Sequence, residues 1–363
     1  MILTSDADRE TLSSNICSPG DCAVPIIHST FHQTHGPYKR TFTFCSPEGR
    51  VWLLGNHLHS DDSSEILEFS LVPLPDDTFV VSAETVDKYC EPFSTLCLTS
   101  TGQVYEWEIS AKVLKLLEIP IRVISLSCGS GFHMLIGEDS SVYSIGENKS
   151  GQLGLGYKSP NVTGYQRVKL DTQAERVFCG VRSSFIISKD GSLWGCGANE
   201  YCQLGQKGGD QWFFSSFIQI YSSSRIASLA PLCYKTVILL KNGRLHTLHK
   251  PVGSYNSEFH VPGRVKLVSL DYFTTSRNSV CYCTDEDGNL WSLSSNQTKC
   301  LMINSGISQC GNVSDHLVGK KHNGELGYIE MSCDNVGFIF MPLDEDYQIL
   351  HSPVRSKSAM NRA

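Results

Sequence analysis

The fold of this chain is decided by Ile145-Gly146-Glu147-Asn148-Lys149-Ser150-Gly151-Gln152-Leu153-Gly154-Leu155-Gly156 and by the similar stretch Cys196-Gly197-Ala198-Asn199-Glu200-Tyr201-Cys202-Gln203-Leu204-Gly205. Each stretch follows a short apolar run. Glycine allows a sharp exit from a strand at a place where a side chain would clash. An Asn side chain at such an exit can hydrogen-bond the backbone of its own loop. Both stretches therefore predict an ordered loop at the end of a β-strand.

Each of these loops is preceded by a β-hairpin pattern, which recurs along the chain. A copy consists of an apolar run, a turn with Gly or a small residue, and a second apolar run. Asp-Gly and Asn-Gly supply the positive φ angles that tight hairpin turns need. Val, Leu, Trp and Tyr after the turn suit a half-buried strand. The seven turns lie at Gly49, Gly102, Ser140, Gly191, Gly243, Gly288 and Gly324.

The spacing of the seven turns predicts the architecture. From Gly49 to Gly324 the average interval is about 46 residues, the size of a propeller blade of four short strands. We therefore expect an all-β fold, a seven-bladed β-propeller of four-stranded antiparallel blades. Little helix is expected, and the best helical candidate is Ser110 to Ile119.

The two loops resemble the signature of the regulator of chromosome condensation repeat, in which Trp-Gly-x-Asn leads into Gly-Gln-Leu-Gly. The stretch Ser127-Cys128-Gly129-Ser130-Gly131-Phe132-His133 is similar to the entry of that repeat into its hairpin, and Gly180 echoes it. Two repeats match well and five match in outline, over residues 26–345. The signatures of WD and kelch repeats are absent.

The resemblance gives a structural role to one set of positions. We expect Gln and Leu of each loop to fill the seam to the next blade, and His133 to form a hydrogen bond that bridges strands. The structural positions are Gly129, His133, Gly146, Asn148, Gly151, Gln152, Leu153, Gly154, Gly180, Gly197, Asn199, Gln203, Leu204 and Gly205.

Composition divides the chain into three parts and limits its partners. Residues 1–24 are polar and predict a flexible leader, residues 25–350 the propeller, and residues 351–363 a disordered tail. Val24 to Ser29 and Gly337 to Met341 are the expected strands that close the ring. The excess of 37 Asp and Glu over 30 Lys and Arg argues against broad binding to nucleic acid. The sequence has no run of the ~20 apolar residues that a membrane helix needs.

The cellular compartment is inferred from the first residues and the cysteines. Met1 to Glu10 lack the basic start and apolar run of a secretory signal. The 15 cysteines then predict reduced, mostly buried thiols in the cytoplasm or nucleus.

No pattern of catalytic, cofactor-binding or metal-ligating residues stands out. The sequence has no Gly-x-Ser-x-Gly elbow, Walker loop or dinucleotide fingerprint. The histidines near His32 and the pair Cys281 and Cys283 lack the paired spacing typical of zinc sites. We therefore expect no catalytic residue, cofactor or metal.

A cluster of aromatic residues falls outside the repeat pattern. Residues 157–175 and 206–224 are expected to be long loops, and the second carries Trp212, Phe213, Phe214 and Phe217. These four side chains either fold back over a blade edge or contact a partner, since aromatic residues dominate interaction hot spots.

Two functions from different classes remain. The first is a non-catalytic protein-interaction platform, monomeric and presenting loops on a rigid ring. The second, implied by the resemblance, is guanine nucleotide exchange on a small GTPase such as Ran. Release of labelled GDP from small GTPases distinguishes the two.

Overall fold

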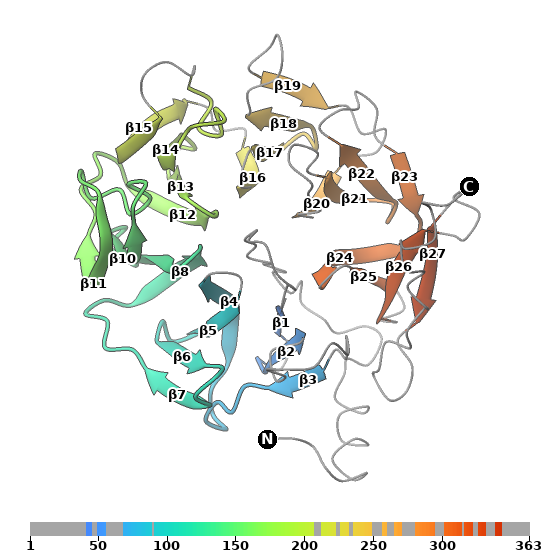
Figure 1. Ribbon diagram of the computed structural model, residues 1–363, viewed down its shortest axis with the longest axis horizontal. Helices are drawn as coiled ribbons and strands as arrows, with labels where there is room; N and C mark the ends of the chain where they lie inside the picture. The colour runs from blue at the N-terminus through green and yellow to red at the C-terminus, as the bar shows by residue number, and fades with distance from the viewer. Residues whose placement is uncertain are drawn as a thin grey trace, which may run out of the picture.

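The computed structural model arranges the chain as a ring of antiparallel sheets (Figure 1). The described residues form seven sheets, one of three strands and six of four, which agrees with the predicted propeller. The structure describes residues 41–45, 49–55, 68–88, 91–206, 212–222, 226–231, 235–248, 256–259, 265–270, 280–294, 301–313, 316–321, 326–331 and 338–342.

The strands follow one another through the sheets in chain order. The first sheet has β1 (Thr41–Cys45), β2 (Val51–Gly55) and β3 (Glu68–Leu71). The second has β4 (Val80–Lys88), β5 (Glu91–Thr99), β6 (Val104–Glu108) and β7 (Val113–Leu116). The third has β8 (Val123–Cys128), β9 (Phe132–Gly137), β10 (Val142–Asn148) and β11 (Ser159–Arg167). The fourth has β12 (Ala174–Cys179), β13 (Ser183–Ser188), β14 (Leu193–Ala198) and β15 (Phe213–Tyr221).

The last three sheets repeat this order, with the first strand nearest the centre of the ring (Figure 1). The fifth has β16 (Ile226–Pro231), β17 (Thr236–Leu240), β18 (Leu245–Leu248) and β19 (Asn256–Phe259). The sixth has β20 (Val265–Leu270), β21 (Val280–Asp285), β22 (Leu290–Ser294) and β23 (Leu301–Asn304). The seventh has β24 (Ile307–Val313), β25 (His316–Lys321), β26 (Leu326–Met331) and β27 (Phe338–Pro342).

The predicted turn positions share one backbone conformation. Six of the seven are described, and all six have positive φ, from 63° at Ser140 to 83° at Gly102. The residue before the turn position also caps the turn in the third and fourth sheets. Asp139 and Asp190 each accept the backbone N–H two residues ahead, at 3.0 Å. The hairpin pattern therefore located the turns correctly, including the one without glycine.

The described strands close the ring in a different way from the one expected from sequence. The segment expected to close the ring at the C-terminal end contains β27, which pairs with β26 of its own sheet and completes four strands there. The first sheet has three described strands, and the turn at Gly49 joins β1 to β2. These two strands therefore correspond to the second and third strands of the other sheets. The leader, Val24 to Ser29 and the tail lie outside the described residues.

Two further sequence expectations were wrong. The helical candidate Ser110 to Ile119 contains the short strand β7, because its apolar residues pair with β6 at the outer edge of the second sheet. The two expected loops contain the outer strands β11 and β15. Both strands carry two register shifts against their neighbours, so they lack the simple alternation that marks a strand in sequence.

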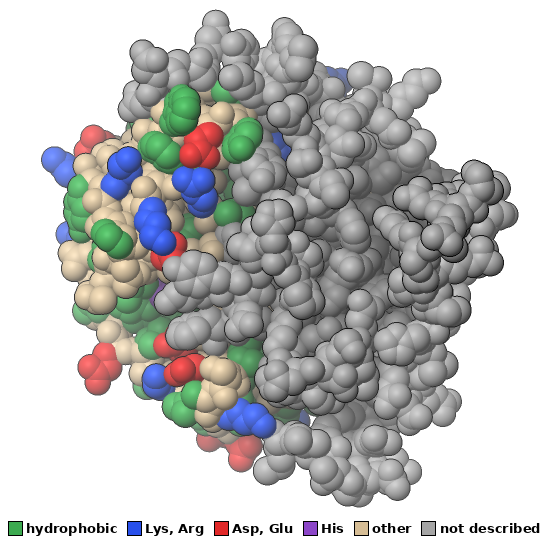
Figure 2. Space-filling model, viewed as in Figure 1, with side chains coloured by type: hydrophobic (Ala, Val, Ile, Leu, Met, Phe, Trp, Pro, Cys, Tyr) green, Lys and Arg blue, Asp and Glu red, His purple; other side chains and the backbone are tan. Residues whose placement is uncertain are grey.

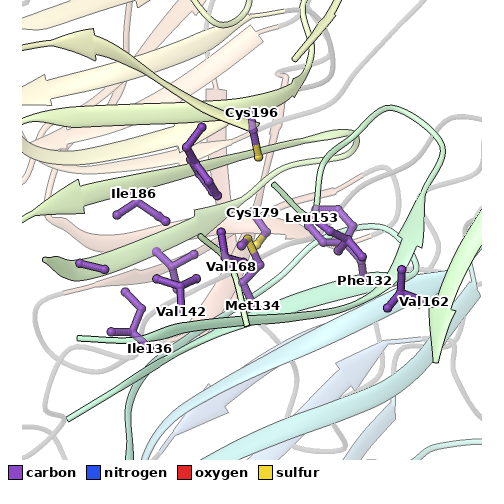
Figure 3. Close-up of a cluster of buried hydrophobic side chains, with 13 residues drawn as sticks. Phe132, Met134, Ile136, Val142, Leu153, Val162, Val168, Cys179, Ile186 and Cys196 are labelled. Carbon is purple, nitrogen blue, oxygen red and sulfur yellow. The ribbon is translucent and has the colours of Figure 1, made fainter. Parts of the chain in front are cut away.

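The apolar core lies between neighbouring sheets. One cluster joins Phe132, Met134 and Leu153 of the third blade to Ile186 and Cys196 of the fourth (Figure 3). A similar cluster lies between each of the other pairs of neighbouring sheets from the first to the sixth. The described side chains thus bury their apolar area mainly against the next blade, which holds the loops in fixed positions. None of the described residues belongs to a helix long and apolar enough to cross a membrane.

Candidate functional site

The two Gly-Gln-Leu-Gly loops are held by their own Asn residues. In the third blade, the Asn148 amide donates to the carbonyl of Tyr157 at 2.9 Å and its Oδ1 accepts the Leu153 N–H at 3.1 Å. In the fourth blade, Asn199 bonds the carbonyl of Gln206 and the N–H of Leu204 in the same way. Both Asn side chains are buried, so each loop is built around an internal polar anchor.

The same loops attach each blade to the next one. The Gln152 carbonyl accepts the hydroxyl of Ser184 in β13 at 2.6 Å. The Gln203 carbonyl accepts the hydroxyl of Thr236 in β17 at 2.8 Å. Leu153 is fully buried in the core cluster between the third and fourth sheets. The loop therefore contributes to the seam through the backbone of Gln and the side chain of Leu.

Several glycines of the motif lie where a side chain does not fit, and Gly154 and Gly146 are two examples. Gly154 has φ +69°, and a Cβ there would overlap the ring of Phe217. Gly146 has φ +109°, and a Cβ would overlap the carbonyl of Gly131. The remaining glycines of the predicted set lie in the same loops or where one inner strand turns to the next: Gly129, Gly151, Gly180, Gly197 and Gly205.

His133 is partly buried inside the third blade and bridges two of its strands. Its Nε2 lies 2.9 Å from the hydroxyl of Tyr165 in β11, two strands away. Burial lowers the pKa of His133 from 6.5 to about 4, so the ring is neutral near pH 7. A neutral imidazole that is bonded across the blade stabilises the packing of its strands.

The four aromatic residues of the second expected loop separate into two pairs. Phe217 is buried in the cluster between the third and fourth sheets, and Phe214 packs against the cluster between the fourth and fifth. Trp212 is 59% exposed, and Phe213 is half-buried beside it. The backbone carbonyl of Trp212 accepts the N–H of Asn199 at 2.7 Å, so this exposed residue is fixed to the fourth-blade loop. The structure therefore places Trp212 and Phe213 together at the surface and the other two inside.

Phe213 lies between two cations from different segments. Lys158 Nζ is 4.6 Å from the centre of its ring, and Arg182 Cζ is 5.8 Å from it. Arg182 also donates to both carboxylate oxygens of Glu200, at 3.1 and 3.3 Å, and to the hydroxyl of Ser150 at 2.9 Å. These bonds fix the guanidinium in place beside the ring.

Two more exposed aromatic side chains lie in the same loops. Tyr157 is 49% exposed and precedes Lys158, and Tyr201 is 45% exposed and follows Glu200. We call this set the Phe213 surface, and its members are Tyr157, Lys158, Arg182, Glu200, Tyr201, Trp212 and Phe213. Figure 2 shows Lys and Arg side chains among hydrophobic ones over the third and fourth blades.

Of this surface, the sequence singled out Trp212 and Phe213 and did not single out Tyr157, Tyr201 or the cations. Lys158 directly follows an exposed Tyr and Arg182 follows the Gly180 turn, and single exposed cations of this kind carry no signal on their own. The useful signal was the pair of matching loops, because equivalent loops of neighbouring blades lie side by side.

The His, Cys, Asp and Glu side chains of the described residues are not grouped as metal ligands. The described residues contain no group of three or more such side chains that could hold a metal ion. Six described cysteines are buried: Cys97, Cys128, Cys179, Cys196, Cys202 and Cys283. Burial raises the pKa of Cys179 and Cys196, so both thiols stay protonated at neutral pH.

Comparison with known proteins agrees with the repeat fold described above. No protein-family model matches the chain. A segment of 126 residues is 32% identical to the RCC2 homologue of Xenopus laevis, covering 31% of this chain and 25% of that protein. A segment of 136 residues is 31% identical to human HERC6, a probable E3 ubiquitin-protein ligase, covering 33% and 13%. The matches thus span a quarter or less of these relatives.

Solved structures show the same fold over most of the chain. Human WBSCR16 matches with a TM-score of 0.60 and 16% identity, over 82% of this chain and 87% of that one. Yeast RCC1 (Prp20), solved bound to Kap60, matches with a TM-score of 0.62 and 16% identity, over 82% and 80%. Prp20p of Saccharomyces cerevisiae, whose study covers binding to Gsp1p and histones, gives a TM-score of 0.60 at 16% identity, over 82% of each chain.

Proposed function

We propose that this chain, an RCC1-like repeat β-propeller, is a non-catalytic platform that binds a protein partner at the Phe213 surface. One observation carries the proposal. Trp212, Tyr157 and Tyr201 are all strongly exposed, yet they stand on two loops that are anchored by buried Asn residues. Large aromatic side chains held rigidly at a surface lose little conformational entropy on binding, and they dominate interaction hot spots.

The related folds support a binding role. The yeast RCC1 (Prp20) structure was solved with Kap60 bound, and a protein partner on a chain of the same fold supports the proposal. We place the platform inside the cell, in the cytoplasm or nucleus, and the six buried cysteine thiols support that placement. We propose a monomeric platform, and a single chain supplies every residue that the Phe213 surface needs.

The experiment compares partner capture by three full-length proteins. The double variant Tyr157→Ala with Trp212→Ala removes the exposed aromatic side chains, and we expect it to lose the main partner captured by the wild type. The matched control is Phe79→Ala, which removes an aromatic side chain that is 47% exposed just before β4. Equal capture by the double variant and the wild type would contradict the proposal.

The fold likeness to Prp20p supports guanine nucleotide exchange as a second candidate. Such exchange needs no covalent step, because a protein that disturbs the phosphate and magnesium site lowers nucleotide affinity. The assay is release of labelled GDP from a panel of small GTPases, Ran included. Accelerated release by the wild-type chain would favour exchange over a passive platform.

A further inference from the structure

We infer that the partner segment bound at the Phe213 surface is an acidic peptide, with carboxylates at Lys158 and Arg182 and an apolar side chain against Trp212. This inference rests on the proposed function and names the chemistry of its partner.

Lys158 carries the available charge. Among the described residues it forms no ion pair, and its ammonium lies over the ring of Phe213. A cation above an aromatic face keeps N–H groups directed toward solvent, where they can donate to an oxygen acceptor. The nearby Lys149 differs, because it is paired with Glu147 at 3.6 Å. An incoming carboxylate can therefore form a new ion pair with Lys158.

Arg182 provides a second, pre-positioned donor on the same ring. A guanidinium has five N–H groups, and three of them are directed to Ser150 and Glu200. Its side chain remains 44% exposed, so the other donors can be reached from solvent. Because Glu200 and Ser150 already fix its position, binding a carboxylate there costs little side-chain entropy.

The aromatic side chains determine the rest of the partner. The exposed Tyr157 adjoins Lys158 in the chain. The exposed Trp212 adjoins Phe213, whose ring contacts both Lys158 and Arg182. A fully polar segment would leave these rings in water and gain only weak surface ion pairs. An acidic residue next to an apolar one satisfies both the cations and the rings.

The charge pattern favours a peptide over a nucleic acid. Affinity for a phosphate backbone depends on many Lys and Arg side chains acting together. The Phe213 surface instead includes Glu200, which is paired with Arg182, on a chain with a net charge of -7. Two cations and three exposed rings match a short acidic motif better than a continuous row of phosphates.

The test is a selection of phage-displayed random short peptides on the full-length protein. We expect enrichment of peptides with Asp or Glu next to Leu, Phe or Trp, and affinity is then measured by fluorescence anisotropy. The variant Lys158→Glu should weaken binding by at least about tenfold, because it places like charges together. Lys158→Gln should give a smaller loss. The matched control is Lys189→Glu, which makes the same change at an exposed Lys in the turn between β13 and β14.

The outcomes separate the inference from the proposed function. Enrichment of neutral or basic peptides whose binding needs Trp212 would contradict the acidic partner but would agree with the proposed platform. Equal losses for Lys158→Glu and Lys189→Glu would overturn the inference too, because the effect would then be one of net charge. A single-stranded oligonucleotide that competes with the peptides and loses affinity in Lys158→Glu would assign the surface to nucleic acid. Peptides unaffected by Trp212→Ala would contradict the Phe213 surface itself.

Discussion

Trp291 donates its indole N–H to Asp285 Oδ2 at 2.8 Å, whereas Trp194, in the equivalent position two sheets earlier, has a buried indole N–H with no acceptor among the described residues. The position of Asp285 is taken by Ser188 in the fourth sheet. The Ser188 hydroxyl is directed to Asp190 and to the carbonyl of Ser192. The two hairpins therefore share a shape and differ in the hydrogen bonds at their turns.

This difference predicts unequal effects of the same substitution. Trp291→Phe removes a hydrogen bond to a carboxylate and leaves Asp285 with one donor fewer. Trp194→Phe removes a buried donor that lacked an acceptor. We expect Trp291→Phe to cost about 1–3 kcal/mol more in free energy of unfolding than Trp194→Phe. Urea denaturation of both variants measures the difference, and equal costs would contradict the assignment of the bond.

The loop glycines predict a second matched pair. Gly154 and Gly164 both have positive φ, but a Cβ at Gly154 overlaps Phe217, while a Cβ at Gly164 has nothing within 4 Å. Gly164→Ala should therefore cost only the backbone strain, about 1–2 kcal/mol. Gly154→Ala should cost a further ~1–3 kcal/mol from the overlap. Equal shifts of the denaturation midpoint in the two variants would count against the loop geometry.

His133 predicts a dependence of stability on pH. Its folded pKa is about 4 and its ordinary value is 6.5, so between these pH values the unfolded chain binds the proton and the folded chain does not. The free energy of unfolding should therefore fall as the pH falls from 6.5 to 4, by at most about 1.4 kcal/mol per pH unit. His133→Gln should remove this slope.

The control for His133 is its hydrogen-bond partner. Tyr165→Phe removes the hydroxyl but keeps the ring that encloses the imidazole. Because burial is the cause of the lowered pKa, we expect Tyr165→Phe to keep the slope. Loss of the slope in Tyr165→Phe would show that the hydrogen bond, and not burial, holds the imidazole neutral.

The two pairs of aromatic residues in and before β15 predict opposite behaviour. Phe217 is 9% exposed and packs in the seam, so Phe217→Ala should cost about 3–5 kcal/mol. Trp212 is 59% exposed, so Trp212→Ala should change stability by no more than about 0.5 kcal/mol. Thermal unfolding measures both, and a large loss for Trp212→Ala would place its side chain in the core.

The ring was predictable from sequence because turn chemistry is local. Asp-Gly and Asn-Gly determine the backbone of a hairpin without help from the rest of the chain. The spacing of the turns then placed Ser140 correctly, although it is not a glycine. The strand β15 was missed because its two register shifts break the alternation of apolar and polar residues.

The Phe213 surface was only half predictable for a different reason. Trp212 and Phe213 are neighbours in sequence, whereas Lys158 and Arg182 come from two other segments. Only the packing of the third blade against the fourth brings them together. Sequence patterns report on neighbours along the chain, so a site made between two blades leaves little trace in either.

All six described inner strands share the same irregularity, one extra residue opposite the next strand, at Val81, Ile124, Glu175, Ala227, Lys266 and Ser308. No two of these residues are of the same type. Val81 and Ile124 are 49% and 46% exposed, and Glu175 is exposed as well. Because the extra residue forms no hydrogen bond with the next strand, a substitution there leaves the backbone hydrogen bonds of the sheet in place. Val81, Ile124 and Glu175 are thus exposed positions on the inner strands where new specificity can evolve at little cost to folding, whereas Ala227 packs against the core.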